Sequence, residues 1–258
     1  MAVPQLRLMA IAGRVALITG ASRGLGKAMA LALAAEGARL ALVARDVEQL
    51  SNVAAEARRL GTQAEVFPAD ITKEAQVLQL ERDVISKLGP VDILINNAGI
   101  NVRKFCVDFT LAEWNSVLET NLTSVFLMCR AFVPHMKGRG YGRILNMTSI
   151  MGHISFPQRT VYSATKAGLL GFTKALALEL AQEKGITVVG ISPGPFATEM
   201  TVPIMNDPVR NEEFLSRVPQ RRWGRPEEVG KLAVYLCSED AAFITGTDIL
   251  IDGGWCAQ

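Results

Sequence analysis

Short aliphatic runs alternate with longer amphipathic segments along almost the whole chain. The short runs are nearly continuous in apolar residues, which predicts strands buried on both faces of a sheet. They lie at residues 15–19, 39–44, 64–68, 92–96, 143–148, 187–191 and 248–251. The longer segments have helical spacing and lie at residues 24–36, 47–60, 73–88, 111–136 and 162–182, with a last one entered through Pro226. This alternation predicts an α/β fold: a single Rossmann-type, doubly wound parallel sheet flanked by helices.

Two boundaries of this pattern can be placed. Thr110, with Glu113 three residues later, predicts a capping box at the start of the helix over 111–136. The first twelve residues are mildly apolar but are interrupted by polar residues and a proline, so they are too short and broken for a membrane span or a secretory signal. We expect residues 1–12 to form a loose arm and residues 13–258 to form a single domain.

Composition narrows the class of protein. The 258 residues are 49% hydrophobic and 20% charged, with a formal net charge of +2, which indicates a compact globule rather than a nucleic-acid or membrane binder. The four cysteines are scattered and form no Cys-x-x-Cys pair, so neither a disulfide framework nor a zinc site is expected. With only two histidines, a histidine-based metal site is not expected either. We expect a cytoplasmic protein that binds no metal.

The turn after the first strand is rich in glycine. Residues 19–26 read Thr-Gly-Ala-Ser-Arg-Gly-Leu-Gly, and they lead from a strand into a helix. Glycines there permit a tight turn and a close approach of backbone amides to a phosphate, which the helix N-terminus also favours. The spacing G-x-x-x-G-x-G differs from the usual G-x-G-x-x-G of dinucleotide sites. The alternative is that the glycines only shape a tight connection.

A possible catalytic pair opens the helix that begins at Tyr162. Tyr162 and Lys166 are four residues apart, so both side chains can point from one helix face into one cleft. A neighbouring cation favours the ionised form of a phenol, whose ordinary pKa is about 10. Tyr162 is therefore interpreted as a general acid/base and Lys166 as its electrostatic support. By itself the spacing is also common on surface helices.

Taken together, these motifs resemble those of the short-chain dehydrogenases/reductases. The glycine turn, Asn96-Asn97-Ala98-Gly99, Asn121, Ser149, Tyr162-x-x-x-Lys166 and Pro193-Gly194 occur in the order and spacing typical of that family, over nearly all of the chain after Ala12. The resemblance implies a dinucleotide-binding and catalytic domain over 13–258. It also implies a tetrad in which Ser149 binds the substrate oxygen, Tyr162 transfers the proton, Lys166 binds the nicotinamide ribose and Asn121 holds a water relay.

The same resemblance implies the residues that contact the cofactor. They are Gly20, Ser22, Arg23, Gly24, Leu25, Gly26, Arg45, Asp70, Ile71, Asn97, Ala98, Gly99, Tyr162, Lys166, Pro193, Gly194 and Thr198. Structural readings stay open for four of the site residues. Ser149 could cap the next helix, Asn121 could satisfy a buried backbone group, Asn97 could be a structural hydrogen-bonding residue, and Asp70 could begin the turn before its helix.

The charged residues at the end of the second strand indicate whether NAD(H) or NADP(H) is the preferred cofactor. NAD-binding proteins place a carboxylate there for the ribose 2′-hydroxyl. This chain has Ala44-Arg45 instead, and Arg23 lies in the glycine turn, so two guanidinium groups could flank a 2′-phosphate. Either arginine could also be a solvated surface charge, and Asp46 opposes their field. We expect NADP(H) to be preferred over NAD(H).

For the substrate, the residues around 97–104, 159–162 and 193–201 are most similar to the gluconate 5-dehydrogenase branch of the family, which acts on sugar acids. Arg103 is the expected anchor for a substrate carboxylate, with Arg159 as the second candidate, beside Ser149 and Tyr162. The segment 195–224 has no regular period and is expected to form a lid.

Two other functions stay open: 3-oxoacyl-[acyl-carrier-protein] reductase, and a sensor or scaffold that binds NADP without catalysis. The resemblance further implies a homotetramer formed through the helices that begin near Leu111 and Tyr162.

Overall fold

The computed structural model describes residues 11–199 and 201–257, and its centre is a parallel sheet of seven strands. The strands lie in the order β3-β2-β1-β4-β5-β6-β7. Their bounds are β1 Val15–Thr19, β2 Arg39–Ala44, β3 Ala64–Pro68, β4 Ile93–Asn96, β5 Gly142–Met147, β6 Ile186–Pro193 and β7 Thr247–Ile251. The predicted doubly wound sheet is thus confirmed. The order reverses between β1 and β4, and this switch point is where open α/β sheets bind ligands.

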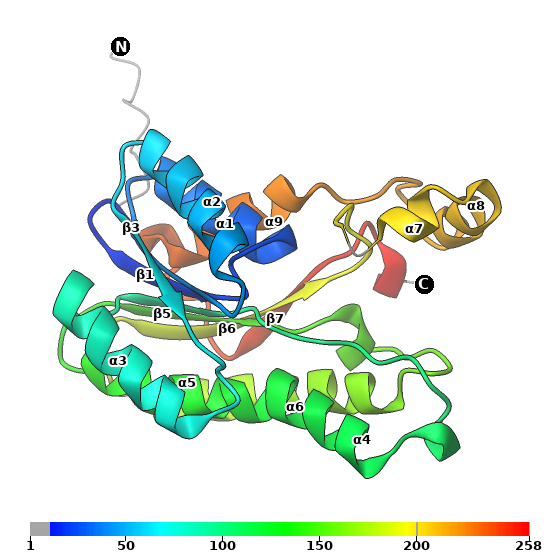
Figure 1. Ribbon diagram of the computed structural model, residues 1–258, viewed down its shortest axis with the longest axis horizontal. Helices are drawn as coiled ribbons and strands as arrows, with labels where there is room; N and C mark the ends of the chain where they lie inside the picture. The colour runs from blue at the N-terminus through cyan, green and yellow to red at the C-terminus, as the bar shows by residue number, and fades with distance from the viewer. Residues whose placement is uncertain (1–10, 200, 258) are drawn as a thin grey trace.

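Helices cover both faces of the sheet (Figure 1). One layer contains α1 Gly24–Ala35, α2 Val47–Arg59 and α9 Pro226–Cys237, and the other contains α3 Glu74–Leu88, α4 Leu111–Leu118, α5 Ser124–Phe132 and α6 Thr160–Glu179. Side chains alternate between the two cores along each strand: Ala16 and Ile18 of β1 pack in one, Val15 and Leu17 in the other. Because both faces are covered, these strands are apolar on both sides.

The helix expected over residues 111–136 is not continuous. The predicted capping box is present, since the Glu113 backbone N–H donates to Thr110 Oγ1 at 3.2 Å and the Thr110 N–H donates to Glu113 Oε2 at 3.0 Å. After α4, however, the chain widens into a π-helical turn at Glu119–Thr123 before α5, and a 3-10 turn at Val133–His135 follows α5. The π turn contains Asn121 and turns its side chain into the interior.

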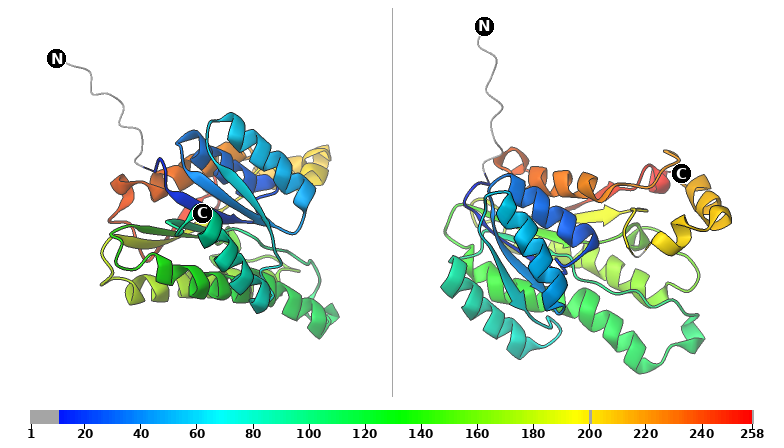
Figure 2. Two further views of the ribbon diagram at one scale, coloured as in Figure 1. Left: turned by 60° about the vertical axis from the view of Figure 1, so that its left-hand side comes forward. Right: turned by 45° about the horizontal axis from the view of Figure 1, so that its top comes forward.

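The segment expected to be irregular contains two short helices, α7 Val202–Met205 and α8 Pro208–Ser216. Asp207 caps α8 by accepting the N–H groups of Val209 and Arg210, and Pro208 occupies the first helical position, where a missing N–H costs nothing. Figure 2 shows α7 and α8 extending past the end of the sheet. The segment expected to form a lid is therefore partly helical.

Most of the expected N-terminal arm, residues 1–10, lies outside the described residues. Ile11, near its end, is fully buried in the core cluster that contains Ala16 and Ile18. None of the helices within 11–199 and 201–257 has the length and apolar character that would let it cross a membrane.

Candidate active site

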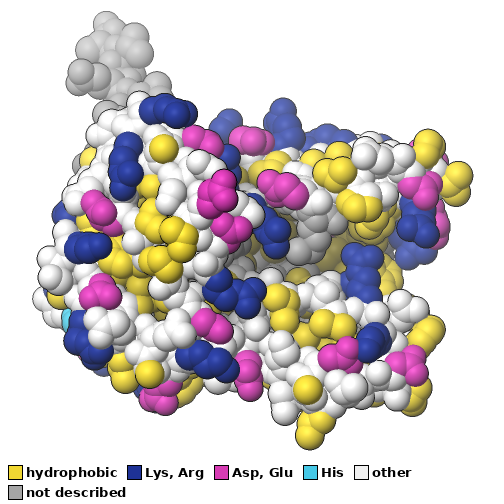
Figure 3. Space-filling model, in the orientation of Figure 1, with side chains coloured by type: hydrophobic (Ala, Val, Ile, Leu, Met, Phe, Trp, Pro, Cys, Tyr) yellow, Lys and Arg dark blue, Asp and Glu magenta, His cyan; other side chains and the backbone are white. Residues whose placement is uncertain are grey.

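A cleft of about 660 Å³ lies at the carboxyl ends of the strands, between the sheet and the lid. Figure 3 shows the molecule hollowed on this face, with Lys and Arg side chains along the rim. All the residues predicted to contact the cofactor line this cleft except Gly24. Of the tetrad, Ser149, Tyr162 and Lys166 line it. The cleft therefore joins the glycine turn at one end to the Ser149 and Tyr162 side chains at the other.

The glycine turn is held by Asn97 and cannot accept a side chain at Gly26. The Asn97 amide donates to the carbonyl oxygens of Thr19, at 2.9 Å, and Gly20, at 3.1 Å, which supports the structural reading of this residue. A Cβ at Gly26 would lie 2.3 Å from the Gly20 oxygen. Gly20 has a φ of +63° and Gly24 one of +56°, which glycine adopts without strain. The result is an open helix N-terminus of the kind that fits a pyrophosphate.

Both arginines invoked for cofactor choice are exposed and line the cleft. The competing carboxylate of Asp46 is already engaged, since it accepts the backbone N–H of Gln49 at 3.0 Å and its side-chain amide at 2.7 Å. Among the described residues, neither Arg23 nor Arg45 has a carboxylate partner within 4 Å. An anion at this end of the cleft would therefore meet two available guanidinium groups.

Asp70 fits both of its readings. It lines the cleft, and its Oδ1 accepts the Thr72 backbone N–H at 3.0 Å and the Thr72 hydroxyl at 2.7 Å. Burial opposes ionisation of Asp70, but the Thr72 hydrogen bonds and the charges of Arg45 and Lys73 outweigh it and lower the pKa of the carboxyl. The side chain thus begins the turn before α3 while it faces the cofactor end of the cleft.

Ser149 and Tyr162 meet at the other end. Ser149 follows β5, and its Oγ accepts the Met151 backbone N–H at 3.1 Å, so it caps the short helical turn that follows. Burial raises the pKa of Tyr162, while a hydrogen bond with Ser149 and the charge of Arg159 lower it. Since burial dominates, the phenol is neutral at physiological pH and can donate a proton.

Lys166 is buried beneath the phenol, with 4% of its surface exposed. Its Nζ donates to the Met147 carbonyl oxygen at 2.6 Å and lies 5.6 Å from the centre of the Tyr162 ring. Burial lowers the pKa of Lys166 from 10.5 to about 8. The ammonium is therefore charged at neutral pH and is held by the last residue of β5, two residues before Ser149.

Asn121 has the structural role that was left open for it. Its Oδ1 accepts the Ile100 N–H at 2.8 Å, and its amide donates to the Ile100 carbonyl at 2.9 Å and to Thr165 Oγ1 at 3.2 Å. The side chain is fully engaged and does not line the cleft, although its neighbour Thr120 does. Asn121 thus fastens α6 and the segment after β4 together.

The two candidate anchor arginines differ in position. Arg103 is exposed and does not line the cleft, whereas Arg159 lines it, and its Nη1 is buried with no hydrogen-bond partner among the described residues. Burial lowers the pKa of Arg159, and the nearby charge of Arg103 adds to the effect. The geometry favours Arg159 over Arg103, which was the expected anchor. A buried guanidinium N–H without an acceptor is costly, so this end of the cleft suits an anion.

Sequence reasoning missed Asn101 and an aromatic wall. Asn101 lines the cleft, and its Oδ1 is buried without a donor among the described residues. The wall is formed by Phe156, Phe214, Trp223 and Trp255; the Phe214 and Trp223 rings stack at 4.9 Å, and Trp255 meets Phe214 and Phe156 edge-on at 5.1 and 5.8 Å. The two Trp side chains, rare in this sequence, were the available signal.

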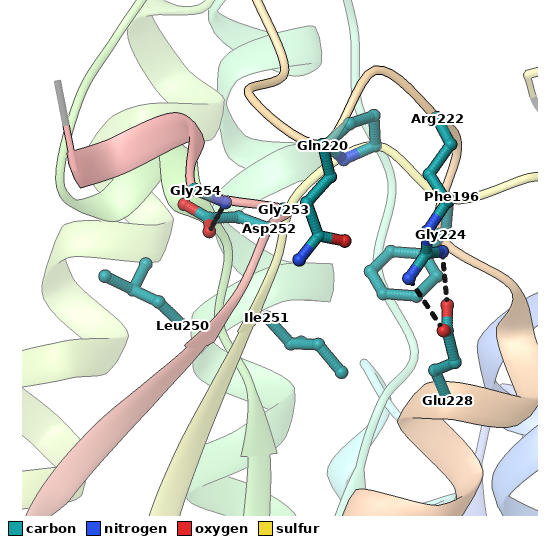
Figure 4. A pocket seen from close by; sticks show the side chains of 11 residues that line it. Phe196, Gln220, Arg222, Gly224, Glu228, Leu250, Ile251, Asp252, Gly253 and Gly254 are labelled. Carbon is teal, nitrogen blue, oxygen red and sulfur yellow. Dashed lines mark hydrogen bonds and ion pairs between the residues drawn. The ribbon is translucent and has the colours of Figure 1, made fainter.

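A second hollow of about 360 Å³ lies behind Phe196, at the base of the lid (Figure 4). Its charged groups already have hydrogen-bond partners: Arg222 donates to both oxygens of Glu228 at 2.9 Å, and Asp252 accepts the backbone N–H of Gly254. The hydrogen bonds from Arg222 and from the Arg225 backbone N–H lower the pKa of Glu228 to about 2. Within the described parts of the chain, no three His, Cys, Asp or Glu side chains are grouped so that they could hold a metal ion.

Comparisons with known proteins agree with this geometry. A family model described as enoyl-(acyl carrier protein) reductase matches residues 20–256. Nodulation protein G of Rhizobium sp. (strain N33) is 41% identical over 95% of this chain and 97% of its own. The identity is 39% to the 3-oxoacyl-[acyl-carrier-protein] reductase of Synechocystis sp., over 96% and 98% of the chains, and 35% to the gluconate 5-dehydrogenase of Gluconobacter oxydans, over 96% of each. The Pseudomonas aeruginosa RhlG/NADP complex superposes with a TM-score of 0.91 at 35% identity and covers 98% of this chain and 100% of its own.

Proposed function

The chain belongs to the short-chain dehydrogenase/reductase family, and we propose that it interconverts a small sugar acid and its keto form, such as gluconate and 5-ketogluconate, with NADP(H). Membership makes it an oxidoreductase of CH–OH groups that uses a nicotinamide cofactor. The finer assignment of substrate and cofactor is our own.

One observation supports the acidic substrate most strongly: the buried, unpartnered Nη1 of Arg159, three residues before Tyr162. A buried hydrogen-bonding group without a partner costs about 1–3 kcal/mol, and more when it is charged. A substrate carboxylate would remove that cost, and a substrate hydroxyl could donate to the unpartnered Asn101 Oδ1. A sugar acid carries both groups on a compact frame.

The chemistry follows from the placement of three side chains. The bound nicotinamide would supply or accept the hydride at the reacting carbon. In reduction, negative charge grows on the carbonyl oxygen, Ser149 donates a hydrogen bond to it, and Tyr162 delivers the proton. The Lys166 ammonium stabilises the phenolate that remains and holds the nicotinamide ribose. For Asn121 we propose only a supporting role through the backbone around Ile100.

The preference for NADP(H) is supported by Arg23 and Arg45 at the adenosine end of the cleft. Their guanidinium groups match the oxygens of a 2′-phosphate. The carboxylate of Asp46, which would repel that phosphate, accepts two hydrogen bonds from Gln49.

A second candidate is reduction of a 3-oxoacyl thioester. It is favoured by the aromatic wall of the cleft, which could pack against an acyl chain, and by the relative of that name in Synechocystis sp.. A non-catalytic sensor is disfavoured because the groups needed for hydride transfer lie together in one cleft.

We also propose a cytoplasmic homotetramer. Large apolar side chains are exposed on three of the four helices of one layer: Leu111 on α4, Phe126 on α5 and Leu178 on α6. A second copy that covered them would remove that apolar surface from water. Light scattering on the purified protein tests the assembly, and a monomer would contradict it.

A substrate panel tests the function. Reduction of 5-ketogluconate, a neutral ketone of similar size and an acetoacetyl thioester should be compared with NADPH and with NADH. We expect the highest kcat/KM for 5-ketogluconate with NADPH. A higher value for the thioester would support the second candidate, and absence of turnover with all three would favour the sensor.

A further inference from the structure

A carboxylate outside the cleft is bonded to both ends of the turn that carries Ser149. Asp248 lies on β7, and its side chain is 8% exposed. Its Oδ1 accepts the hydroxyl of Thr148 at 2.5 Å, and its Oδ2 lies 2.9 Å from Nε2 of His153. Thr148 immediately precedes Ser149, and His153 follows it by four residues. One side chain of β7, two strands away from β5, therefore holds this turn on both sides.

Ser192 on β6 completes the network. Its Oγ lies 2.9 Å from Thr148 Oγ1 and 3.2 Å from His153 Nε2. Between the two attachments, backbone hydrogen bonds close the turn: the Gly152 N–H donates to the Ser149 carbonyl at 2.8 Å, and the His153 N–H donates to that of Ile150 at 2.9 Å. Movement of Ser149 thus requires several of these bonds to break together.

Gly190 permits the carboxylate to reach this position. Gly190 of β6 is the register partner of Asp248, and a Cβ on it would lie 2.1 Å from Asp248 Oδ1. The Asp248 side chain therefore crosses over Gly190 of β6 to reach Thr148, the residue that follows β5 in the sequence. A glycine in a strand interior weakens the strand and often marks a place where another group approaches the backbone closely. At Gly190 that group is the Asp248 carboxylate.

The cluster is not a nucleophilic triad, although it contains a serine, a histidine and an aspartate. In such a triad the acid and the hydroxyl contact opposite ring nitrogens. Here Asp248 and Ser192 both contact Nε2 of His153, and Ser192 is fully buried. The arrangement can fix atoms in place but cannot relay a proton to Ser192.

We infer that Asp248 is a positioning residue for carbonyl reduction. Through Thr148 and His153 it holds the Ser149 turn so that the Ser149 hydroxyl meets the Tyr162 hydroxyl at the substrate oxygen. Hydrogen bonds to a carboxylate are stronger than those between neutral groups, which suits this task. A displacement of about 1 Å at a reacting group can cost on the order of a hundredfold in rate. The inference rests on the role proposed for Ser149.

The test compares Asp248→Ala and Thr148→Val with Thr148→Ser, which keeps the hydroxyl, and with Thr247→Ala, an exposed neighbour on β7, as the control. With the carbonyl substrate that wild type reduces fastest, we expect kcat to fall by about tenfold or more in the first two, within the range for misplaced groups. Thr148→Ser and the control should stay within about twofold, and NADPH binding should be unchanged in all four. Gly190→Ala should reproduce the loss with Asp248 still present.

A double mutant separates positioning from general damage. If Asp248 acts through Ser149, Asp248→Ala should add nothing to the loss already caused by Ser149→Ala. Equal losses in both backgrounds would overturn the inference, as would wild-type kcat in Gly190→Ala.

Hydrogen exchange of the amides of residues 150–154 needs no substrate: faster exchange in Asp248→Ala supports the inference and unchanged exchange overturns it. A wrong substrate proposal would appear instead in the wild-type substrate panel and would leave these ratios intact.

Discussion

Lys166 lies one helical turn after Tyr162, with its Nζ 5.6 Å from the centre of the phenol ring, and it donates to the backbone of β5 at 2.6 Å. The ammonium is therefore close enough to stabilise a phenolate but is held by the strand and not by the phenol. Lys166 therefore does not occupy the Tyr162 hydroxyl, which can meet the substrate oxygen beside Ser149. Among the described residues, the Tyr162 hydroxyl is the group to which we assign the proton that is transferred in the reaction.

Tyr162→Phe should remove most turnover and leave cofactor binding intact. The phenol is partly buried and neutral, and loss of a general acid costs roughly a hundred- to ten-thousandfold. Steady-state kinetics and NADPH fluorescence titration measure the two effects. Tyr235→Phe, on the partly exposed surface of α9, is the matched control. Turnover near that of wild type in Tyr162→Phe would contradict the assignment.

Lys166 should make stability depend on pH. Its pKa is about 8 in the folded protein, below the ordinary value of 10.5 that the unfolded chain retains, so between these values the unfolded chain binds a proton that the folded chain has lost. Stability relative to Lys166→Met should therefore rise with pH across this window, by about 3 kcal/mol in total. Urea unfolding at several pH values measures the difference. Lys174→Met, at an exposed position of the same helix, should give a curve parallel to wild type; a parallel curve for Lys166→Met would disprove the effect.

Arg45→Ala should weaken NADPH binding and spare NADH. A hydrogen bond to a charged group contributes about 1.5–3 kcal/mol, which corresponds to roughly ten- to a hundredfold in Kd. Titration of both cofactors into wild type, Arg45→Ala and the control Arg59→Ala, an exposed arginine of α2, measures the selectivity. Equal weakening of NADPH and NADH binding, or a wild-type preference for NADH, would refute the role of Arg45 in binding the 2′-phosphate.

Arg159→Gln should lower kcat/KM for an acidic substrate but not for a neutral ketone. The variant removes the charge beside Tyr162, and we expect a loss of about ten- to a hundredfold, as for one charge-assisted hydrogen bond. Arg103→Ala, which removes an exposed guanidinium near the cleft, should have the smaller effect. If Arg103→Ala has the larger effect, the anchor predicted from the sequence is the correct one.

Gly26→Ala should disrupt cofactor binding. A Cβ there would lie 2.3 Å from the Gly20 oxygen and 2.5 Å from the Asn97 amide nitrogen, so the turn must shift. We expect NADPH affinity to fall by more than about tenfold, since a shift of the backbone amides removes charge-assisted hydrogen bonds to phosphate. Gly171→Ala, which has open space around it on α6, is the control. Wild-type affinity in Gly26→Ala would contradict this account of the turn.

Most of the sheet could be predicted because the strands are mostly apolar runs and alternate with long helical segments. The two lid helices were missed because α7 has four residues and α8 nine, too few to establish a period. Asp207 followed by Pro208 was the local signal for the second helix. The π turn at Asn121 changes no hydrophobic spacing that the sequence displays, so the continuous helix was the natural expectation.

The residues of the candidate site likewise divide into those that the sequence could place and those that it could not. Tyr162 and Lys166 could be paired because they lie on one helix, where spacing determines direction. Arg103 and Arg159 could not be ranked, since Arg103 follows a strand in an irregular segment and Arg159 precedes a helix, and no period gives the direction of either side chain. Asp248 could not be linked to Ser149 at all, because that link requires the order of β5, β6 and β7.

The two ends of the lid meet at one point. The Ala197 N–H donates to the Gly224 carbonyl at 2.9 Å, and the Gly224 N–H donates to that of Pro195 at 2.8 Å, so residues 197–223 leave and rejoin the body of the protein at the same place. Surface connections tolerate insertions and substitutions better than the elements that they join, so we expect changes beyond that junction to disturb the sheet little. During evolution, this excursion can therefore diverge to accommodate new substrates while the reaction is retained.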